Sequence, residues 1–462
     1  MKTQIISFLS LVAFLITFNS CNEPLIENQG ENSPELKGGR VKTVEHIVHL
    51  NKESEFNKEE IASDGGLTND FNANNDKIEA LAVAVLSKHG ISSNTIGKVF
   101  GNSIWGFTVN ITVNQAELLE STEDVLGAAR NWSINTAGLA PKKKPRPDPT
   151  PDPVEGQETP ASVLMVLGEN LVPKNDDTKR VWILDTGVSQ HDDLNVISGK
   201  SFVDYTSSTN DDNGHGTHVA GIIAAKNNDI GVVGISPGAT IIPIKILDRG
   251  GSGREADALA AMDYVAFNCQ PGDVILMAFH GNQRDYIDSA AVEIAKKDAK
   301  IAIAAGNMHW NANARSPASA NHSNIYTVSA CDIDGNFWEN SNHGNPPVDI
   351  CAPGIDVRST SKNGSYEMQT GTSMSAAHVA GLLLQGWDGE FDKTVIGDPD
   401  DIYHPDGYRV YTENIGGIDG LNGCVSYHNA GYIDPIAKLG GDFKLSDYLL
   451  SLDVTYGTCH PN

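Results

Sequence analysis

The chain has 462 residues, of which 40% are hydrophobic, so it is long enough to form more than one globular domain. Its formal net charge is −26 at pH 7. This acidic balance argues against nucleic acid or an anionic membrane surface as a partner, and it indicates a self-repelling surface that favours solubility.

The first 20 residues are predicted to be a signal peptide. Lys2 precedes an apolar run from Ile5 to Phe18, which is too short for a membrane span and typical of the hydrophobic part of a signal. The run ends at Ser20-Cys21, which resembles a bacterial lipoprotein processing site; ordinary signal cleavage nearby is the alternative. We therefore expect an exported, bacterial protein. A lipid on Cys21 would hold it at the cell surface or outer membrane, and without the lipid it would be extracellular.

The cysteines show no metal-ligand spacing and no CxxC pair. They are Cys21, Cys269, Cys331, Cys351, Cys424 and Cys459. With Cys21 set aside the number is odd, so at least one thiol is unpaired. Disulfides suit an exported protein, and the pair that we favour is Cys424–Cys459.

Residues 21–42 are polar and contain glycine, which predicts a disordered tether. Residues 43–136 are predicted to be a separate small domain of alternating strands and helices. One strand, Trp105–Ile111, has apolar residues at alternate positions, and Thr112 with Gln115 fits a capping box that starts a helix. The other predicted elements are a strand over Val44–Leu50, a helix over Ile78–Leu86 and a strand over Val125–Trp132.

A proline-rich segment, Pro141–Pro153, follows this domain. Proline can neither donate to a sheet nor continue a helix, so residues 137–160 are predicted to be a stiff, extended linker. Residues 161–405 alternate between strand-like and helix-like runs, which predicts a parallel sheet flanked by helices. The predicted strands are Arg180–Leu184, Ile241–Leu247, Val274–Phe279, Ile301–Ala305 and Ile325–Ala330, and the predicted helices are Ala256–Phe267 and Ser289–Asp298. Residues 406–462 are glycine-rich and predict a loop-rich appendage of unassigned role.

Three short glycine-containing segments carry an acid, a base and a nucleophile in that order. Asp185 follows a buried strand, and His215 and Ser373 each begin a predicted helix. A serine hydroxyl needs a base, an imidazole can accept and return the proton, and a buried carboxylate can fix the imidazole tautomer. This chain order is one of those in which the geometry occurs. His218 and His378 are alternative bases, although packed structural histidines are the simpler interpretation.

The sequence around these residues resembles the subtilases, the subtilisin-like serine proteases, and is most similar in pattern to their proteinase K group. The similar segments lie within residues 157–400 and are Ile183–Val188, Asn213–Gly221, Ala304–Asn307 and Gly371–Gly381. The resemblance implies that Asp185 orients the base, that His215 is the general base and that Ser373 is the nucleophile. It also implies that Asn307 donates its side-chain amide to the oxyanion, together with the backbone N–H of Ser373.

The resemblance extends to the small domain and implies a zymogen. Residues 43–136 resemble the ferredoxin-like α+β inhibitor prodomain of subtilases, most clearly at Trp105–Asn110; an unrelated α/β sandwich is the alternative. Gln157–Pro160 resembles the start of a mature subtilase. We therefore expect activation cleavage between about residues 137 and 160, ahead of a three-layer catalytic domain with a parallel sheet.

Two segments are expected, by the same resemblance, to form the edges of a cleft in which the substrate lies as an added strand. They comprise Gly251, Ser252 and Gly253 on one edge and Ala278, Phe279, His280 and Gly281 on the other. Subtilases usually carry Ser-Leu-Gly where this chain has Ala278–His280, so we expect the bulky Phe279 and His280 to narrow or alter the primary pocket. Ala377 replaces a usual proline, which a helix tolerates.

The chemistry requires no cofactor, but the resemblance implies a structural calcium site. Its ligands would be the carboxylate of Asp349 and backbone carbonyls near Ser323 and Ile325, which are the oxygen ligands that calcium prefers. A surface-turn aspartate is the alternative for Asp349. A further acidic cluster fits no calcium-loop pattern and comprises Asp204, Asp211 and Asp212.

The function that we predict is a secreted or surface-tethered serine endopeptidase, made as a zymogen. It would hydrolyse protein or peptide substrates through an acyl-enzyme, and its own prodomain would inhibit it. A subtilase-type transpeptidase or macrocyclase, which passes the acyl group to an amine instead of water, is the alternative. A non-catalytic binding protein is a third, but the intact set of Asp185, His215, Asn307 and Ser373 argues against it.

Overall fold

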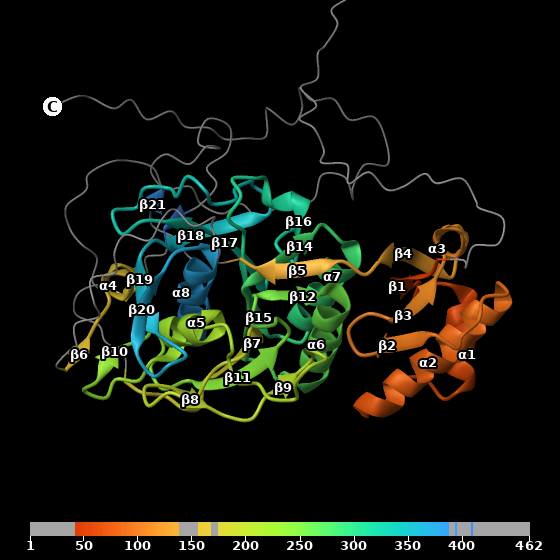
Figure 1. Ribbon diagram of the computed structural model, residues 1–462, viewed down its shortest axis with the longest axis horizontal. Coiled ribbons are helices and arrows are strands. Elements are labelled where there is room, and N and C mark those ends of the chain that lie inside the picture. Colours follow the sequence, from red (N-terminus) through yellow and green to blue (C-terminus); the bar gives the residue numbers. More distant parts are fainter. Residues whose placement is uncertain (1–41, 138–155, 168–173, 388–392, 395–407, 410–462) are drawn as a thin grey trace, which may run out of the picture. The chain divides into compact units, whose positions relative to one another are not determined.

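The computed structural model describes residues 42–137, 156–167, 174–387, 393–394 and 408–409 (Figure 1). The predicted signal peptide, the tether, most of the linker and most of the appendage lie outside these residues, as do Cys21 and the expected Cys424–Cys459 pair. Cys269 and Cys331 are free thiols. Within the described parts of the chain, no helix is both long enough and apolar enough to cross a membrane.

The small N-terminal domain is an antiparallel sheet covered by helices. Its four strands lie in the order β2-β3-β1-β4. Apolar side chains of the longest helix, such as Ile78 and Leu86, pack in one buried cluster with Val48 and Phe107 of the sheet. The elements are β1 (Val44–Leu50), α1 (Glu55–Ser63), α2 (Phe71–Lys88), β2 (Ile96–Phe100), β3 (Gly106–Ile111), α3 (Val113–Glu120) and β4 (Val125–Arg130). This is the ferredoxin-like α+β arrangement that the sequence predicts.

The capping box predicted at Thr112 is present at the start of α3. The Thr112 hydroxyl accepts the backbone N–H of Gln115, and the Gln115 side chain accepts the N–H of Thr112. Helix α1 is not predicted from the sequence, because only Asn57 and Ile61 of its residues are buried and no apolar stripe shows.

The second domain is built on a ten-stranded sheet in the order β21-β22-β18-β17-β15-β13-β7-β11-β8, with β9 paired to β11. From β18 to β8 every neighbouring pair is parallel. The strands are β7 (Arg180–Asp185), β8 (Asn195–Val196), β9 (Lys200–Ser201), β11 (Thr240–Lys245), β13 (Val274–Met277), β15 (Lys300–Ala304), β17 (Ile325–Cys331), β18 (Val348–Pro353), β21 (Lys393–Thr394) and β22 (Tyr408–Arg409). The predicted parallel sheet is confirmed, and it includes residues beyond the expected domain boundary at residue 405.

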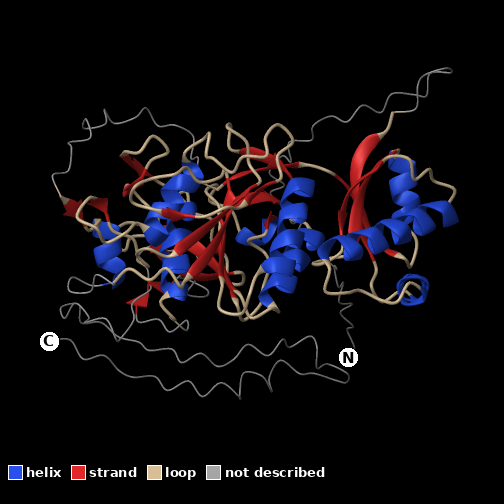
Figure 2. Ribbon diagram, turned by 90° about the horizontal axis from the view of Figure 1, so that it is seen from below, coloured by secondary structure: helices blue, strands red, loops and turns tan. Residues whose placement is uncertain are grey.

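Helices cover both faces of this sheet (Figure 2). On one face, α5 (His215–Ala224) and α8 (Thr372–Leu384) share a core with Val181 and Ile183 of β7. On the other face, α6 (Glu255–Asn268) and α7 (Asp285–Ala295) share a core with Trp182 and Leu184. Burial on both faces explains why β7 is a continuous apolar run in the sequence.

A smaller sheet lies at one end of the large one and contains a strand from outside the domain. Its order is β12-β5-β14-β16, and β5 (Ser133–Thr136) lies between β12 and β14 (Figure 1). The other three strands are β12 (Ser252–Arg254), β14 (Phe279–Asn282) and β16 (Arg315–Ser316). The remaining elements are β6 (Gln157–Glu158), α4 (Ala161–Leu167), β10 (Gly231–Val232), a 3₁₀ turn (Ala312–Ala314), β19 (Val357–Thr360) and β20 (Tyr366–Gln369).

Candidate active site

Asp185 and His215 are brought into contact at the carboxyl end of the parallel sheet. Asp185 is the last residue of β7 and fully buried, and His215 is the first residue of α5. Both carboxylate oxygens lie 2.8 Å from Nδ1 of His215. Gly216 permits this approach, because a Cβ there would lie 2.0 Å from the carbonyl oxygen of Gly187. Nδ1–H therefore donates to Asp185, and Nε2, which has no hydrogen-bond partner among the described residues, is left as the acceptor.

The loop before His215 is held by Asp211, a buried residue to which the sequence assigned no role. One carboxylate oxygen accepts the N–H of Gly214 at 2.8 Å and the hydroxyl of Thr186 at 2.9 Å. The other accepts the N–H and the hydroxyl of Thr217. Asp211 therefore ties the turn after Asp185 to the first turn of α5, which fixes how the acid and the base face each other.

A buried lysine also contacts the turn after Asp185. Lys245 at the end of β11 is fully buried, and its ammonium donates to the carbonyl oxygens of Thr186 and Leu247. It also forms an ion pair with Asp212 at 2.7 Å. Sequence alone does not reveal either contact, because a single lysine ending an apolar strand usually points to solvent. Asp204 pairs with Arg254, so two members of the acidic cluster noted in the sequence, Asp204 and Asp212, form ion pairs, whereas Asp211 accepts hydrogen bonds.

The three candidate histidines differ in their electrostatics. Burial alone would lower the pKa of His215, but the charge and hydrogen bond of Asp185 outweigh burial and raise that pKa above its ordinary value. Burial lowers the pKa of His218 to about 3 and that of His378 to about 4. His218 Nε2 faces the carbonyl oxygens of Val357 and Glu367, and His378 Nδ1 faces its own helix at Met374. Both are therefore neutral structural histidines.

Ser373 lies at the N-terminal end of α8, which packs against α5. Its side chain is fully buried, and Oγ lies 3.5 Å from the carbonyl oxygen of Ala278. The positive end of the helix dipole favours negative charge that develops there. Ser375, two residues later, instead donates to Ala352 at 2.9 Å. The helix continues through Ala377 without a break, as expected for alanine at the position of the usual proline.

Asn307 lies beside the start of the same helix, and its amide orientation is fixed by Thr372. The Asn307 carbonyl oxygen accepts both the N–H and the hydroxyl of Thr372, each at 2.9 Å. The Asn307 amide nitrogen is buried and has no partner among the described residues. A buried donor without an acceptor is costly, so this nitrogen is suited to an oxyanion at the adjacent Ser373.

The cleft edges predicted from the sequence pair with β5. On one side Ser252 and Gly253 lie opposite Asn135 and Ile134. On the other side Phe279 and His280 lie opposite Thr136 and Asn135, with Gly281 next along β14. Backbone bonds continue past the strand, since Thr136 N–H donates to Gly251 and Ala137 N–H donates to Ala278, both at 2.9 Å. The chain's own segment thus lies as an added strand between the two segments predicted to be cleft edges.

The expectation that both Phe279 and His280 alter the primary pocket needs a correction. Phe279 is fully buried and packs with Ile134 in the core beneath the sheet. Side chains alternate along a strand, so only His280 lies on the face that Asn135 and Ala137 share. Of the two side chains, only His280 therefore lies on the face of the sheet that residue 137 shares.

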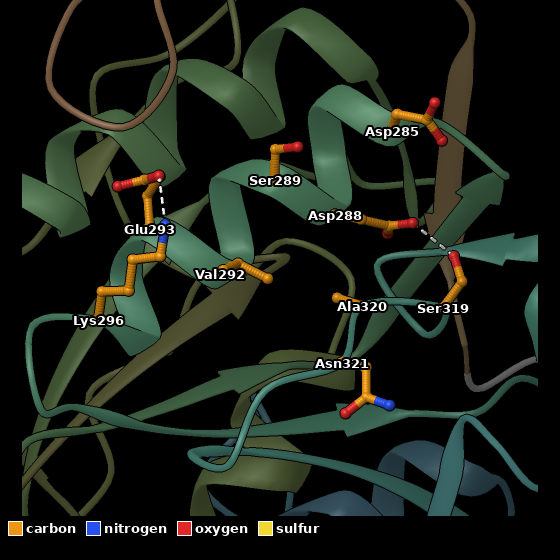
Figure 3. Close-up of a pocket in the computed structure, with 9 residues that line it drawn as sticks. All are labelled: Asp285, Asp288, Ser289, Val292, Glu293, Lys296, Ser319, Ala320 and Asn321. Carbon is orange, nitrogen blue, oxygen red and sulfur yellow. Dashed lines mark hydrogen bonds and ion pairs between the residues drawn. The ribbon is translucent and has the colours of Figure 1, made fainter. Parts of the chain in front are cut away.

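Two further acidic side chains, Asp349 and Asp288, are not part of this site. Asp349 in β18 accepts the N–H of Thr327 at 2.8 Å, which places its carboxylate beside the start of β17. A pocket of about 310 Å³ lies along α7, where Asp288 accepts the hydroxyl of Ser319 at 2.6 Å and Glu293 pairs with Lys296 (Figure 3). Burial raises the pKa of Asp288 to about 6. None of Asp185, His215 and Ser373 lines this pocket.

The parallel α/β sheet, the Asp185–His215 pair and the helix-borne serine are those of a serine hydrolase site. Comparison with known proteins gives the family. A profile of the Subtilase family matches residues 177–401. Subtilisin Savinase from Lederbergia lenta is 37% identical over 202 residues, which are 44% of this chain and 73% of that protein. The chain therefore belongs to the subtilase family.

Other relatives are matched over a smaller share of their length. A thermostable alkaline protease from Halalkalibacterium halodurans is 37% identical over 203 residues, 44% of this chain and 55% of that protein. The minor extracellular protease Epr from Bacillus subtilis is 36% identical over 204 residues, 44% of this chain and 31% of that protein. The match thus spans only about half of the first of these. The crystal structure of a cold adapted subtilisin-like serine proteinase covers 54% of this chain and 97% of its own, with 28% identity and a TM-score of 0.48.

Proposed function

We propose that this protein is a serine endopeptidase made as a zymogen, with a site most similar to the proteinase K group. One observation carries the proposal. The carbonyl oxygen of Ala278 accepts the N–H of Ala137 at 2.9 Å and lies 3.5 Å from the hydroxyl of Ser373. A peptide strand of this chain thus ends beside the candidate nucleophile, in the hydrogen-bonded form that an endopeptidase requires of its substrate.

The proposed chemistry follows from the contacts of each group. Ser373 Oγ attacks the peptide carbonyl carbon while His215 Nε2 takes its proton, and Asp185 stabilises the imidazolium. Asn307 Nδ2 and the N–H of Ser373 stabilise the oxyanion. His215 then protonates the leaving amine, and water, with its proton taken by His215, hydrolyses the acyl-enzyme. If a peptide amine replaced water, the product would be joined or cyclic, which mass spectrometry of the products would detect.

The N-terminal domain is proposed to act as the inhibitor. Asn102 and Ser103 of this domain each donate a backbone N–H to the buried carboxylate of Asp263 in α6, at 2.7 Å. Lys98 pairs with Asp257 of the same helix at 2.6 Å. With β5 lying in the cleft, these contacts hold the chain's own segment where a substrate would bind.

We place the activation cleavage after Ala137, within the expected range of residues 137–160. Ala137 is the residue whose N–H bonds to Ala278 beside Ser373, so its carbonyl is the one that the hydroxyl can reach. The wild-type chain, made in a host without other proteases, should show a new N-terminus at Gly138. Ser373→Ala should remain uncut.

Ser375→Ala is the matched control, because Ser375 lies in the same helix but donates to Ala352. It should process like the wild type. Equal processing of wild type and Ser373→Ala would refute self-cleavage by this site.

Export and anchoring remain proposals based on residues 1–21. The signal-like run and Cys21 support a lipoprotein, and the likeness to an extracellular protease of Bacillus subtilis supports export. Labelled fatty acid should be incorporated by the wild type in a bacterial host. Cys21→Ser should lose the label and move to the medium, and a label retained by Cys21→Ser would remove Cys21 from the proposal.

A structural calcium site at Asp349 also remains a proposal. The carboxylate lies beside the start of β17, close in sequence to the carbonyls of Ser323 and Ile325. The described residues contain no group of three or more acidic, histidine or cysteine side chains placed to hold a metal, so backbone carbonyls and water would complete the shell. Chelation should lower the Tm of the wild type and leave that of Asp349→Asn unchanged. An equal shift in both proteins would place the ion elsewhere.

A further inference from the structure

The side chain that precedes the proposed scissile bond lies on a face of the small sheet that also carries polar side chains. Asn135 lies opposite His280, and Asn282 lies opposite Arg315 in the next strand. Residues opposite each other, or two apart on one strand, share a face of the sheet. The side chain at position 137 therefore projects to the face that carries His280, Asn282 and Arg315. The side-chain oxygen Oδ1 of Asn282 accepts a hydrogen bond from Arg315 Nη1 at 3.0 Å, which confirms that these two side chains share a face.

The Arg315 guanidinium lies between the two segments that flank the cleaved residue. Besides Asn282, it contacts the sulfur of Met308 at 3.5 Å, one residue after the oxyanion donor Asn307. It lies over the Trp310 ring, 4.3 Å from the centroid. The cation is thus held in one place by stacking and by a side-chain amide, both of which leave donors available.

Among the described residues the charge of Arg315 has no paired carboxylate, and its Nε–H is buried without a partner. Burial lowers the pKa of Arg315, because a partly desolvated guanidinium lacks compensation. Burial and the nearby charge of Arg315 also lower the pKa of His280 to about 4, so the imidazole is neutral and adds no second charge.

We infer that Arg315 is a specificity-determining residue that directs this protease to substrates with a glutamate or aspartate side chain before the scissile bond. The inference rests on the proposed protease function and deepens it by naming a substrate class. A carboxylate entering from position 137 would meet the only charged group placed on that face by the β5, β14 and β16 register of the described residues. The guanidinium fork fits a carboxylate with two hydrogen bonds.

The residue at position 137 of the chain's own segment suits an inhibitor, which must leave the site after cleavage. Ala137 is small, neutral and buried in an apolar cluster, so it offers no carboxylate to Arg315. Its cleavage is intramolecular and needs no binding energy from that pocket, because the chain holds it in place. An acidic substrate supplied in trans gains the interaction that Ala137 lacks and can displace the cut strand.

The test compares three otherwise identical peptides with Glu, Gln or Leu before the scissile bond, cut by the self-processed protein. A charge-assisted hydrogen bond contributes roughly 10- to 100-fold, so kcat/KM should favour Glu over Gln by at least about 10-fold. Arg315→Gln should lose that preference. Arg358→Gln removes a half-buried arginine that pairs with Glu158 outside this cleft, and it should keep the preference.

The results separate the failure of this inference from the failure of the proposed function. Cleavage of the Leu peptide with no preference for Glu over Gln, or a preference that survives in Arg315→Gln, overturns the role of Arg315 and leaves the protease intact. No cleavage of any peptide by protein whose Ser373 also fails to react with a serine-directed phosphonate overturns both. Thermal unfolding and phosphonate labelling of Ser373 show whether the Arg315→Gln variant is folded.

Discussion

Replacement of Asn307 tests the oxyanion site most selectively, because its two amide atoms have separate tasks. The oxygen accepts two hydrogen bonds from Thr372, whereas the buried nitrogen has no partner among the described residues. Asn307→Asp keeps the oxygen and replaces the donor by a negative charge. Asn307→Ala removes both atoms.

Each substitution has its own expected magnitude. Loss of one oxyanion donor lowers kcat by about 10²–10³, a value measured in a subtilisin and therefore borrowed here from a member of this family. KM should change little, because the donor acts on charge that develops in the transition state. Asn307→Ala should also destabilise the fold by roughly 1–3 kcal/mol, since the buried N–H of Thr372 loses its acceptor, whereas Asn307→Asp keeps that acceptor.

The assay is steady-state hydrolysis of a peptide together with thermal unfolding of each protein. Asn307→Asp should be at least as slow as Asn307→Ala, because its charge repels the oxyanion, and it should be the more stable of the two. Thr372→Val serves as the control, because it removes the hydrogen bond from the Thr372 hydroxyl to Asn307 and leaves the Asn307 amide nitrogen in place. A kcat close to wild type in both Asn307 variants would refute the assignment.

Three further predictions concern the triad and the prodomain. The fall of kcat/KM at acid pH reports the pKa of His215, which Asp185 holds above its ordinary value. In Asp185→Asn burial dominates and lowers that pKa, so the fall in kcat/KM should move to lower pH. The maximal rate should also fall on the order of 10⁴, a size known from other triads including a subtilisin. A fall that stays at the same pH would dissociate Asp185 from the base. Ser373→Ala and Ser373→Ala/His215→Ala should have nearly equal residual rates, since the groups act as a unit, and a further large loss in the double variant would contradict this. Asp263→Asn removes the charge-assisted hydrogen bonds from Asn102 and Ser103. The isolated N-terminal domain should therefore inhibit this variant roughly 10- to 100-fold more weakly than the wild type. Unchanged inhibition would show that these bonds are dispensable.

The elements that sequence predicts best are those whose pattern reflects burial on both faces. The strand that ends at Asp185, the helix that begins at His215 and the helix that carries Ser373 in its first turn are all predicted, because apolar runs and glycine turns mark them. The predicted run Val274–Phe279 is divided into β13 and β14, because the backbone changes sheets at Ala278 to form the cleft edge. A local apolar pattern does not encode that change of partner.

Sequence motifs placed the chemical groups but not the contacts that arrange them. Asp211 and Lys245 hold the turn after Asp185 through bonds to Thr186, which lies far from both in the sequence. The occupancy of the cleft by β5 likewise depends on long-range pairing, since Ser133–Thr136 has no strong pattern of its own. Arg315 shows no motif either, and only its pairing opposite Asn282 places it in the cleft.

The central claim is that Ser373 is a nucleophile activated by His215. Its most direct test is the reaction of the self-processed protein with a serine-directed phosphonate, followed by mass spectrometry of the peptide that carries the adduct. The account predicts one adduct, on Ser373, with loss of peptide hydrolysis in proportion to labelling and no adduct in His215→Ala. An adduct on another residue, or full hydrolysis by protein labelled at Ser373, would contradict it.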